Sequence, residues 1–334
     1  NFIIHYHNYD REYDEQGTVN KYYSQSFTAK TDSDLTINDR LSFGYGAEYK
    51  YDWGDYKTLT FTSQTKGHLH NIGVFANTGY KFNENQSFSF HLRNDDHKET
   101  GGNQTYKINF SQIFNDLQLG LTHSTGLKNP SLYELYGSSS SHSGSTSIDP
   151  EKSKTNELYA QYNFSKNIKF TSTFYRTNMT DRIKIKSDWS GYENKEPDTT
   201  QEGVESEIYL TFKNEQKIGI FSHFAKSRTE TGGPNSRRPD LSYGIDYEKK
   251  LNLKEYGPIN LNLNYRYIGD HLDWTGSKNE FVKSVDLIDL SVRKEILGNV
   301  FSINFTNLLN ERYEKPATYS QDGRQLVIGY KKMY

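Results

Sequence analysis

The sequence contains no cysteine and only 7 prolines in 334 residues. Without cysteine the chain has neither a disulfide framework nor a thiolate metal site, and no redox compartment can be inferred. Long apolar runs are also missing, because no segment approaches the ~18 uninterrupted apolar residues of a membrane helix. If the chain crosses a bilayer, it therefore does so with strands.

Net charge and mean hydropathy are both low, at −2 and −0.91. Low hydropathy alone would suggest disorder, but disordered chains have few aromatic residues and a large net charge. This chain has 27 Tyr and 19 Phe instead. Its apolar residues are few but periodic, which indicates a folded protein.

Apolar and polar residues alternate with the period of a β-strand. Leu261 and Leu263 alternate with Asn262 and Asn264, and Ile303 lies between Ser302 and Asn304. Strict alternation places the two sets on opposite faces of a strand, one apolar and one polar. About sixteen such strands are predicted, with bounds good to about ±3 residues. They cover residues 1–10, 20–30, 40–52, 68–82, 86–97, 104–114, 117–126, 153–164, 167–178, 200–213, 216–229, 238–250, 258–269, 284–294, 299–309 and 324–334.

The connections between these strands alternate between tight turns and long polar loops. An up-and-down antiparallel barrel in an outer membrane has this arrangement, with turns on one rim and extended loops on the other. A soluble propeller or sandwich would have short loops on both rims or a blade repeat near 40–50 residues, which the sequence lacks. The predicted turns lie at 82–85, 114–117, 164–167, 213–216 and 296–299, and the predicted loops at 52–67, 127–152, 186–199, 230–237, 270–283 and 310–323.

Residues that could carry chemistry are few. His5 and His7 share one strand face, but two histidines without a nearby carboxylate are more often wall residues than metal ligands. A second cluster is expected to be solvated loop charge, with calcium or metal binding as the alternative; it consists of Asp95, Asp96, His97 and Glu99. No hydrolase, zinc-protease, phosphate-loop or dinucleotide motif occurs. The sequence therefore predicts no enzyme, no cofactor and no metal centre.

Specific motifs lie in the second half of the chain. Residues 126–137 read GLKNPSLYELYG, and the strand that returns after them begins IDPEKS at 148–153. Near the end, residues 307–313 read NLLNERY and 322–324 read DGR. In order and spacing these segments resemble the TonB-dependent outer-membrane receptors. The resemblance covers about residues 120–334, and the earlier strands by architecture only.

The resemblance implies an all-β, antiparallel transmembrane barrel. Residues 1–334 would be the C-terminal part of a receptor barrel, with about sixteen of a probable 22 strands. The N-terminal plug domain and the first strands would be missing from this chain. The implied localisation is the outer membrane, in contact with its lipid, with TonB engaged through the missing N-terminal region and no nucleic acid bound.

Within this family the closest likeness is to the vitamin B12 (cobalamin) receptors. That likeness implies that Arg237 faces the ligand and that Trp274 lies in a loop that helps to close over a corrinoid. Arg237 could equally be a rim arginine in a salt-bridge network. The implied function is active transport of a scarce nutrient, such as cobalamin or an iron-siderophore complex. A passive porin and a surface β-barrel adhesin remain the alternatives.

Overall fold

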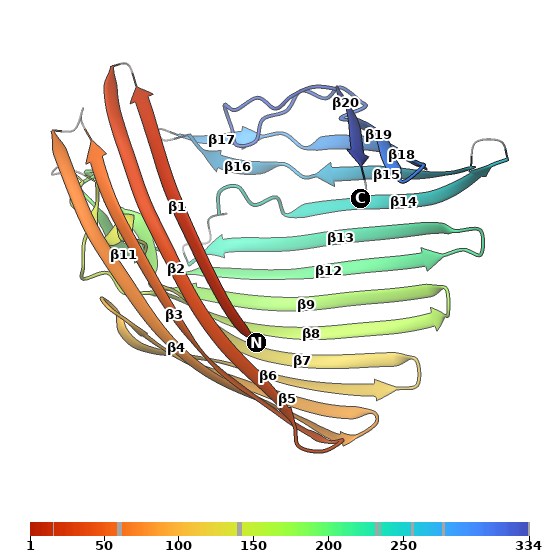
Figure 1. Cartoon of the computed structure of the whole chain (residues 1–334), viewed down its shortest axis with the longest axis horizontal. Coiled ribbons are helices and arrows are strands. Elements are labelled where there is room, and N and C mark those ends of the chain that lie inside the picture. The colour runs from red at the N-terminus through yellow and green to blue at the C-terminus, as the bar shows by residue number, and fades with distance from the viewer. Residues whose placement is uncertain are drawn as a thin grey trace. The chain divides into compact units, whose positions relative to one another are not determined.

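A computed structural model describes residues 1–15, 17–58, 62–138, 142–230, 233, 235–254, 257–275 and 278–332. In this part of the chain sixteen strands form one antiparallel sheet, in the order β1-β2-β3-β4-β5-β6-β7-β8-β9-β12-β13-β14-β15-β18-β19-β20 (Figure 1). All sixteen predicted strands are therefore present, and the predicted all-β class is confirmed. Two separate two-stranded sheets pair β10 with β11 and β16 with β17.

The bounds of the strands follow the alternating segments of the sequence. The first half contains β1 (Phe2–Glu15), β2 (Thr18–Thr36), β3 (Leu41–Thr58), β4 (Ser63–Asn83), β5 (Gln86–His97), β6 (Gly101–Phe114), β7 (Leu117–Lys128), β8 (Glu151–Ser165) and β9 (Ile168–Thr180). The second half contains β12 (Thr199–Thr211), β13 (Gln216–Thr229), β14 (Leu241–Leu253), β15 (Gly257–Ile268), β18 (Val285–Ile296), β19 (Asn299–Thr306) and β20 (Gln325–Lys332). The small hairpins are β10 (Arg182–Ile185) with β11 (Tyr192–Glu196), and β16 (His271–Trp274) with β17 (Asn279–Val282).

One helix occurs among the described residues, α1 (Leu132–Tyr136), with five residues. No helix in that part of the chain is long and apolar enough to cross a membrane. The chain divides into two compact units. Unit 1 contains residues 1–112, 120–156 and 177–199, and unit 2 contains 113–119, 157–176 and 200–334.

Strands β1 to β4 of unit 1 are much longer than predicted. They contain 14, 19, 18 and 21 residues, and the loop predicted at 52–67 is wrong because its ends belong to β3 and β4. Cross-strand aromatic contacts line these extensions, including Tyr22 with Tyr56 at 5.6 Å and Tyr23 with Trp53 at 5.5 Å between ring centroids. Such pairs stabilise a sheet beyond the point where the apolar alternation ends.

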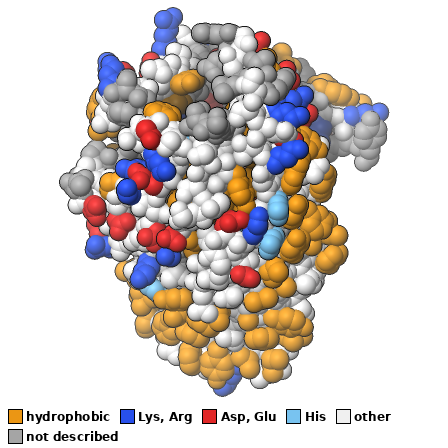
Figure 2. Space-filling view, turned by 90° about the vertical axis from the view of Figure 1, so that its left-hand side faces the viewer, with side chains coloured by type: hydrophobic (Ala, Val, Ile, Leu, Met, Phe, Trp, Pro, Cys, Tyr) orange, Lys and Arg blue, Asp and Glu red, His pale blue; other side chains and the backbone are white. Residues whose placement is uncertain are grey.

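The strand registers of unit 1 separate a polar face from an apolar face. On one face His7, Ser26 and Asp52 oppose one another across β1, β2 and β3. On the other face the matching row is aromatic, from Tyr6 through Phe27. Hydrophobic side chains gather toward the lower end of the side drawn in Figure 2, and most charged ones lie above them.

Unit 2 shows the same separation, and the predicted facing of its strands agrees with the registers. Leu261, Val292, Ile303 and Ile328 form one row across β15, β18, β19 and β20. The row beside it on the opposite face is polar and internally hydrogen bonded, as where the Ser291 hydroxyl donates to the Asn304 amide oxygen at 2.6 Å. Apolar side chains are thus exposed on one face and amides line the other.

The connections of unit 2 are short at one end and long at the other, as predicted. Antiparallel pairing from β13 to β20 places the turns at 213–216 and 296–299 at one end. The long connections at 230–240, 269–284 and 307–324 lie at the opposite end. The sites described below lie at the long-loop end of unit 2 and on the polar face of unit 1.

Candidate functional site

The connection between β7 and β8 carries helix α1 and forms one wall of the site in unit 1. Its N-cap is Ser131, whose hydroxyl accepts a hydrogen bond from the Glu134 N–H at 3.3 Å. The Glu134 carboxylate accepts in return from the Ser131 N–H at 2.7 Å. The N-cap contact in such a capping box stabilises a helix by about 0.5–2 kcal/mol, and it defines where this very short helix begins.

Helix α1 packs against the polar face of the long strands through a small apolar core. Leu135 is 1% exposed and clusters with Leu69 of β4 and with Ile148. Gly67 of β4 makes room for the helix, because a Cβ atom there would collide with the Tyr136 ring. The connection therefore lies back over the strands.

Polar contacts fasten the C-terminal end of α1 to the turn between β5 and β6. The Tyr136 hydroxyl donates to the Glu99 carboxylate at 2.6 Å, and Lys98 Nζ donates to the Tyr136 hydroxyl at 3.0 Å. Lys98 also pairs with Glu99 at 3.3 Å. The hydrogen bond from Tyr136 is the largest cause that lowers the pKa of Glu99 below its usual value.

Hairpin β10–β11 closes around the same connection. The N–H of Ser143 donates to the Ser190 carbonyl at 3.0 Å. Aromatic rings join the hairpin to α1, with Tyr133 and Tyr192 each close to the His142 ring, at centroid distances of 5.1 and 5.3 Å. Four separate elements of the chain thus meet at this point: α1, the hairpin, β3 and β4.

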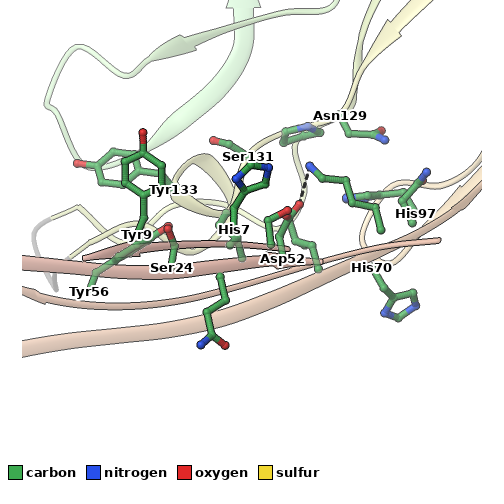
Figure 3. A pocket seen from close by; sticks show the side chains of 17 residues that line it. His7, Tyr9, Ser24, Asp52, Tyr56, His70, His97, Asn129, Ser131 and Tyr133 are labelled. Atoms are coloured by element: carbon green, nitrogen blue, oxygen red, sulfur yellow. Dashed lines mark ion pairs between the residues drawn. The ribbon is translucent and has the colours of Figure 1, made fainter. Parts of the chain in front are cut away.

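A cavity of about 460 Å³ lies between the α1 connection and the strands (Figure 3). Tyr56 and Tyr133 gather at one end of it, with ring centroids 6.1 Å apart. His70 points away to the other side of the strands, in agreement with its register. Most residues that line the cavity are aromatic or polar: His7, Tyr9, Ser24, Gln25, Ser26, Lys50, Asp52, Tyr56, His70, Asn71, His97, Asn129, Ser131 and Tyr133. Leu69, Pro130 and Leu132 complete the lining.

The cavity carries one cation close to a carboxylate. Lys50 Nζ lies 2.9 Å from Asp52 Oδ2, on the same face of β3. Both side chains are partly exposed, so this pair is weak and is easily exchanged for contacts with a ligand. The lining thus combines a lysine, tyrosine rings and hydroxyl groups, which together can bind an anionic, partly aromatic small molecule.

The acidic cluster around residue 95 differs from the prediction. Asp95 and His97 lie within β5 and are only 7% and 5% exposed, so the prediction of solvated loop charge is wrong for them. Asp95 accepts two hydrogen bonds from Arg93, each at 2.7 Å, and one from Asn71 at 2.6 Å. Arg93 also reaches Glu48 at 2.9 Å. Alternation decides this, because Asp95 lies on the polar face of the sheet with Glu48, whereas Asp96 lies opposite Ile72 on the other face.

The candidate histidine pair remains on one face of β1. The rings of His5 and His7 are stacked with centroids 6.4 Å apart, and His7 lines the cavity. Among the described residues no group of three His, Asp or Glu side chains is arranged to hold a metal ion. His7 thus brings a ring with two hydrogen-bonding nitrogens to the lining of the cavity.

Arg237 lies in unit 2, at the long-loop end of its strands. Arg237 Nε donates to Asp273 Oδ1 at 2.5 Å, and the Arg237 N–H donates to the Leu272 carbonyl at 2.7 Å. Arg237 thus forms a salt bridge with the neighbouring hairpin. The backbone of Trp274 belongs to the same hairpin, but its side chain lies outside the described part of the structure.

The geometry can now be compared with known proteins. A family model described as "TonB dependent receptor-like, beta-barrel" matches residues 2–308. The chain belongs to this TonB-dependent receptor family. The motifs recognised in the sequence lie in the second half of the chain, and this match shows that the earlier strands belong to the same family barrel. Members of this family are outer-membrane β-barrels for transport and not enzymes, as the sequence predicted.

Several solved structures share the fold of this TonB-dependent receptor barrel. The siderophore receptor PirA from Acinetobacter baumannii has a TM-score of 0.75 and 16% identity, over 92% of this chain and 54% of that one. The FrpB iron transporter from Neisseria meningitidis has a TM-score of 0.75 and 12% identity, over 93% and 55%. The ferric yersiniabactin uptake receptor FyuA from Yersinia pestis has a TM-score of 0.74 and 13% identity, over 98% and 57%.

The chain thus spans a little over half the length of the solved receptors that it matches. At these identities the likeness shows the fold alone. No curated protein matches the chain by sequence. The solved proteins named above are two siderophore receptors and an iron transporter, so they lend no specific support to the predicted likeness to cobalamin receptors.

Sequence reasoning singled out His7 and His97, but it missed most of the other residues that line the cavity. Tyr9, Lys50 and Tyr133 are ordinary members of alternating or loop segments, and only the fold brings them together. One signal was available, because Ser131 followed three residues later by Glu134 is the pattern of a capping box. That pattern would have placed a helix inside the predicted loop at 127–152.

Proposed function

We propose that this chain is the barrel part of an outer-membrane receptor that takes up a ferric siderophore with energy from TonB. The observation that carries the proposal is the cavity on the polar face of unit 1, which joins Lys50 to the aromatic rings of Tyr9, Tyr56 and Tyr133. An anionic iron chelate with aromatic groups would find a cation and stacking surfaces there. Several neighbours with this fold are named siderophore receptors, which supports the same ligand class.

Arg237 and Trp274 remain part of the proposal as residues of the receptor's loops. Arg237 keeps an exposed side chain, 61% accessible, although one of its donors binds Asp273. It could meet a ligand that enters past the long loops of unit 2. A corrinoid is the second ligand that the sequence suggests, through the motif around residues 126–137.

Binding to the purified protein tests the cavity. A double variant, Tyr9→Ala with Lys50→Gln, removes one ring and the cation without touching a buried side chain, because Tyr9 is 68% exposed. We expect the dissociation constant for the ferric siderophore that binds the parent protein to rise about tenfold or more. Quenching of the intrinsic fluorescence of the 3 tryptophans measures it.

The matched control changes the same residue types on the same two strands but on the opposite face. Tyr6→Ala with Lys57→Gln should leave the affinity unchanged, since the registers of β1 and β3 place both residues away from the cavity. The screen should include ferric enterobactin, ferric yersiniabactin and cobalamin. Equal losses in both double variants, or tight binding of cobalamin alone, would contradict the proposal.

A further inference from the structure

A second cavity, of about 280 Å³, lies within unit 2 and shares no lining residue with the cavity of unit 1. It lies where three connections at the long-loop end meet: residues 235–240, hairpin β16–β17, and the segment around 313–318. Its floor is apolar. It is formed by Pro239, Ile268, Val282, Val285 and Pro316.

A buried carboxylate holds these three connections in place. Asp273 is 0% exposed and accepts from Arg237 Nε at 2.5 Å on one oxygen. Its other oxygen accepts from the Ala317 N–H at 2.8 Å. Val282 and Val285 are each only 7% exposed beside it. The walls of the cavity are therefore fixed before any ligand arrives, which lowers the entropy cost of binding.

Positive charge is in excess at the mouth of this cavity. Arg237, Lys283 and Lys315 line it, and all three side chains are exposed. Asp273 matches the charge of Arg237. Glu314, whose carboxylate accepts from the Thr318 N–H at 2.7 Å, is the one carboxylate among the described lining residues. Lys283 and Lys315 form no ion pair within the described residues.

Arg237 also has hydrogen-bond donors that no described residue of the protein engages. A guanidinium group has five N–H donors, and Asp273 engages Nε. No described residue of the protein accepts a hydrogen bond from Arg237 Nη1 or Nη2. Those nitrogens are arranged as a fork, the geometry that matches a carboxylate.

We propose that this cavity is a binding site for a small amphipathic monoanion, an organic acid with an apolar body. The apolar body would lie on the valine, isoleucine and proline floor, and the carboxylate would meet Arg237, Lys283 and Lys315. The uncompensated positive charge of the lining selects an anion, and the apolar floor selects a molecule with a hydrocarbon or aryl portion. This site does not depend on the ligand of the cavity in unit 1.

The test uses the protein purified from outer membranes and reconstituted in lipid nanodiscs. The probe is 4-(4-fluorophenyl)butanoate, observed by fluorine NMR, with the corresponding alcohol as its uncharged counterpart. The parent protein should bind the acid above the level of empty nanodiscs and bind the alcohol more weakly. Lys283→Gln with Lys315→Gln should weaken binding of the acid about tenfold.

The control double variant is Lys166→Gln with Lys169→Gln. Lys166 lies in the turn between β8 and β9, and Lys169 lies at the start of β9. Both are exposed, belong to unit 2 and do not line the cavity. Their replacement should leave binding of the acid unchanged. Equal weakening in both double variants, equal binding of acid and alcohol, or no signal above empty nanodiscs would overturn the proposal.

Discussion

Gly137 is the residue on which the shape of the α1 connection depends most directly. It has φ +73°, a left-handed backbone conformation, and a Cβ atom there would collide with the carbonyl oxygen of His142. Its N–H donates to the Tyr133 carbonyl at 2.9 Å, which ends the helix. Glycine is required here for two separate reasons, conformation and space.

Replacing Gly137 with alanine should therefore detach the connection from the strands. Gly101 offers a matched control, because it has φ +67° but open space around its Cβ position. Gly101→Ala should cost about 1–2 kcal/mol from backbone strain alone. Gly137→Ala should in addition raise hydrogen exchange throughout residues 131–138. The same exchange in both variants would show that the close approach to His142 is unimportant.

The contact between Tyr136 and Glu99 should make the docking of α1 depend on pH. The pKa of Glu99 is lowered in the folded protein, first by the hydrogen bond from Tyr136. A lowered pKa means that the contact stabilises the docked state above the ordinary carboxyl pKa, and that this stability is lost as pH falls through the lowered value. Hydrogen exchange of α1, corrected for intrinsic rates, should increase below about pH 4.5.

Tyr136→Phe removes the donor and keeps the ring against Gly67. In that variant the exchange of α1 should be faster at neutral pH and should change less with acid. The account of this contact is contradicted if both proteins show the same acid dependence, since another group would then be responsible.

At the scale of elements, the strands of the large sheet could be predicted from the sequence and the two small hairpins could not. Alternation and turn residues predict all sixteen strands, because a strand with one apolar face requires apolar and polar residues to alternate in the sequence. The extensions of β3 and β4 escaped prediction because tyrosines and charged residues replace the apolar row there. The hairpins β10–β11 and β16–β17 are only four or five residues per strand, too short to show a period.

The two faces of β15 should respond in opposite ways to a charge. Leu263 is exposed on the apolar face, where it opposes Leu290 of β18, whereas Asn262 opposes Ser291 on the polar face. Leu263→Arg should lower the free energy of unfolding by ~2–4 kcal/mol in a bilayer, while Asn262→Arg should cost little. Denaturant titration in lipid vesicles measures both. Equal losses would mean that the apolar face does not lie against lipid.

The candidate site was less predictable than the strands, for a physical reason. Lys50 and Asp52 lie on one strand, but Tyr133 comes from a connection about 80 residues further along the chain. Alternation assigns each residue to a face and says nothing about which connection folds over that face. The capping box at Ser131 predicts the helix, while its docking depends on Leu135 and on the space left by Gly67.

At the scale of the whole molecule, the strands have one apolar face and one polar face, and a cavity lies on the polar face of unit 1. The same division of faces appears in each unit separately, through the registers of β1 to β4 and of β13 to β20. Membership of the TonB-dependent receptor family gives that division its meaning, because the apolar face of an outer-membrane strand lies against lipid. The polar face is then free to bind and pass a hydrophilic ligand.

Energy-dependent uptake tests the proposed function most directly. Iron-starved cells that lack their own siderophore receptors would express a complete receptor, with a plug and a TonB-binding region, whose barrel includes this chain. Entry of radioactive iron as a ferric siderophore would be measured with and without functional TonB. We predict uptake only in the cells with TonB, and about tenfold less for the variant Tyr9→Ala with Lys50→Gln than for Tyr6→Ala with Lys57→Gln. Iron entry that is equally fast without TonB would indicate a passive pore and contradict the account.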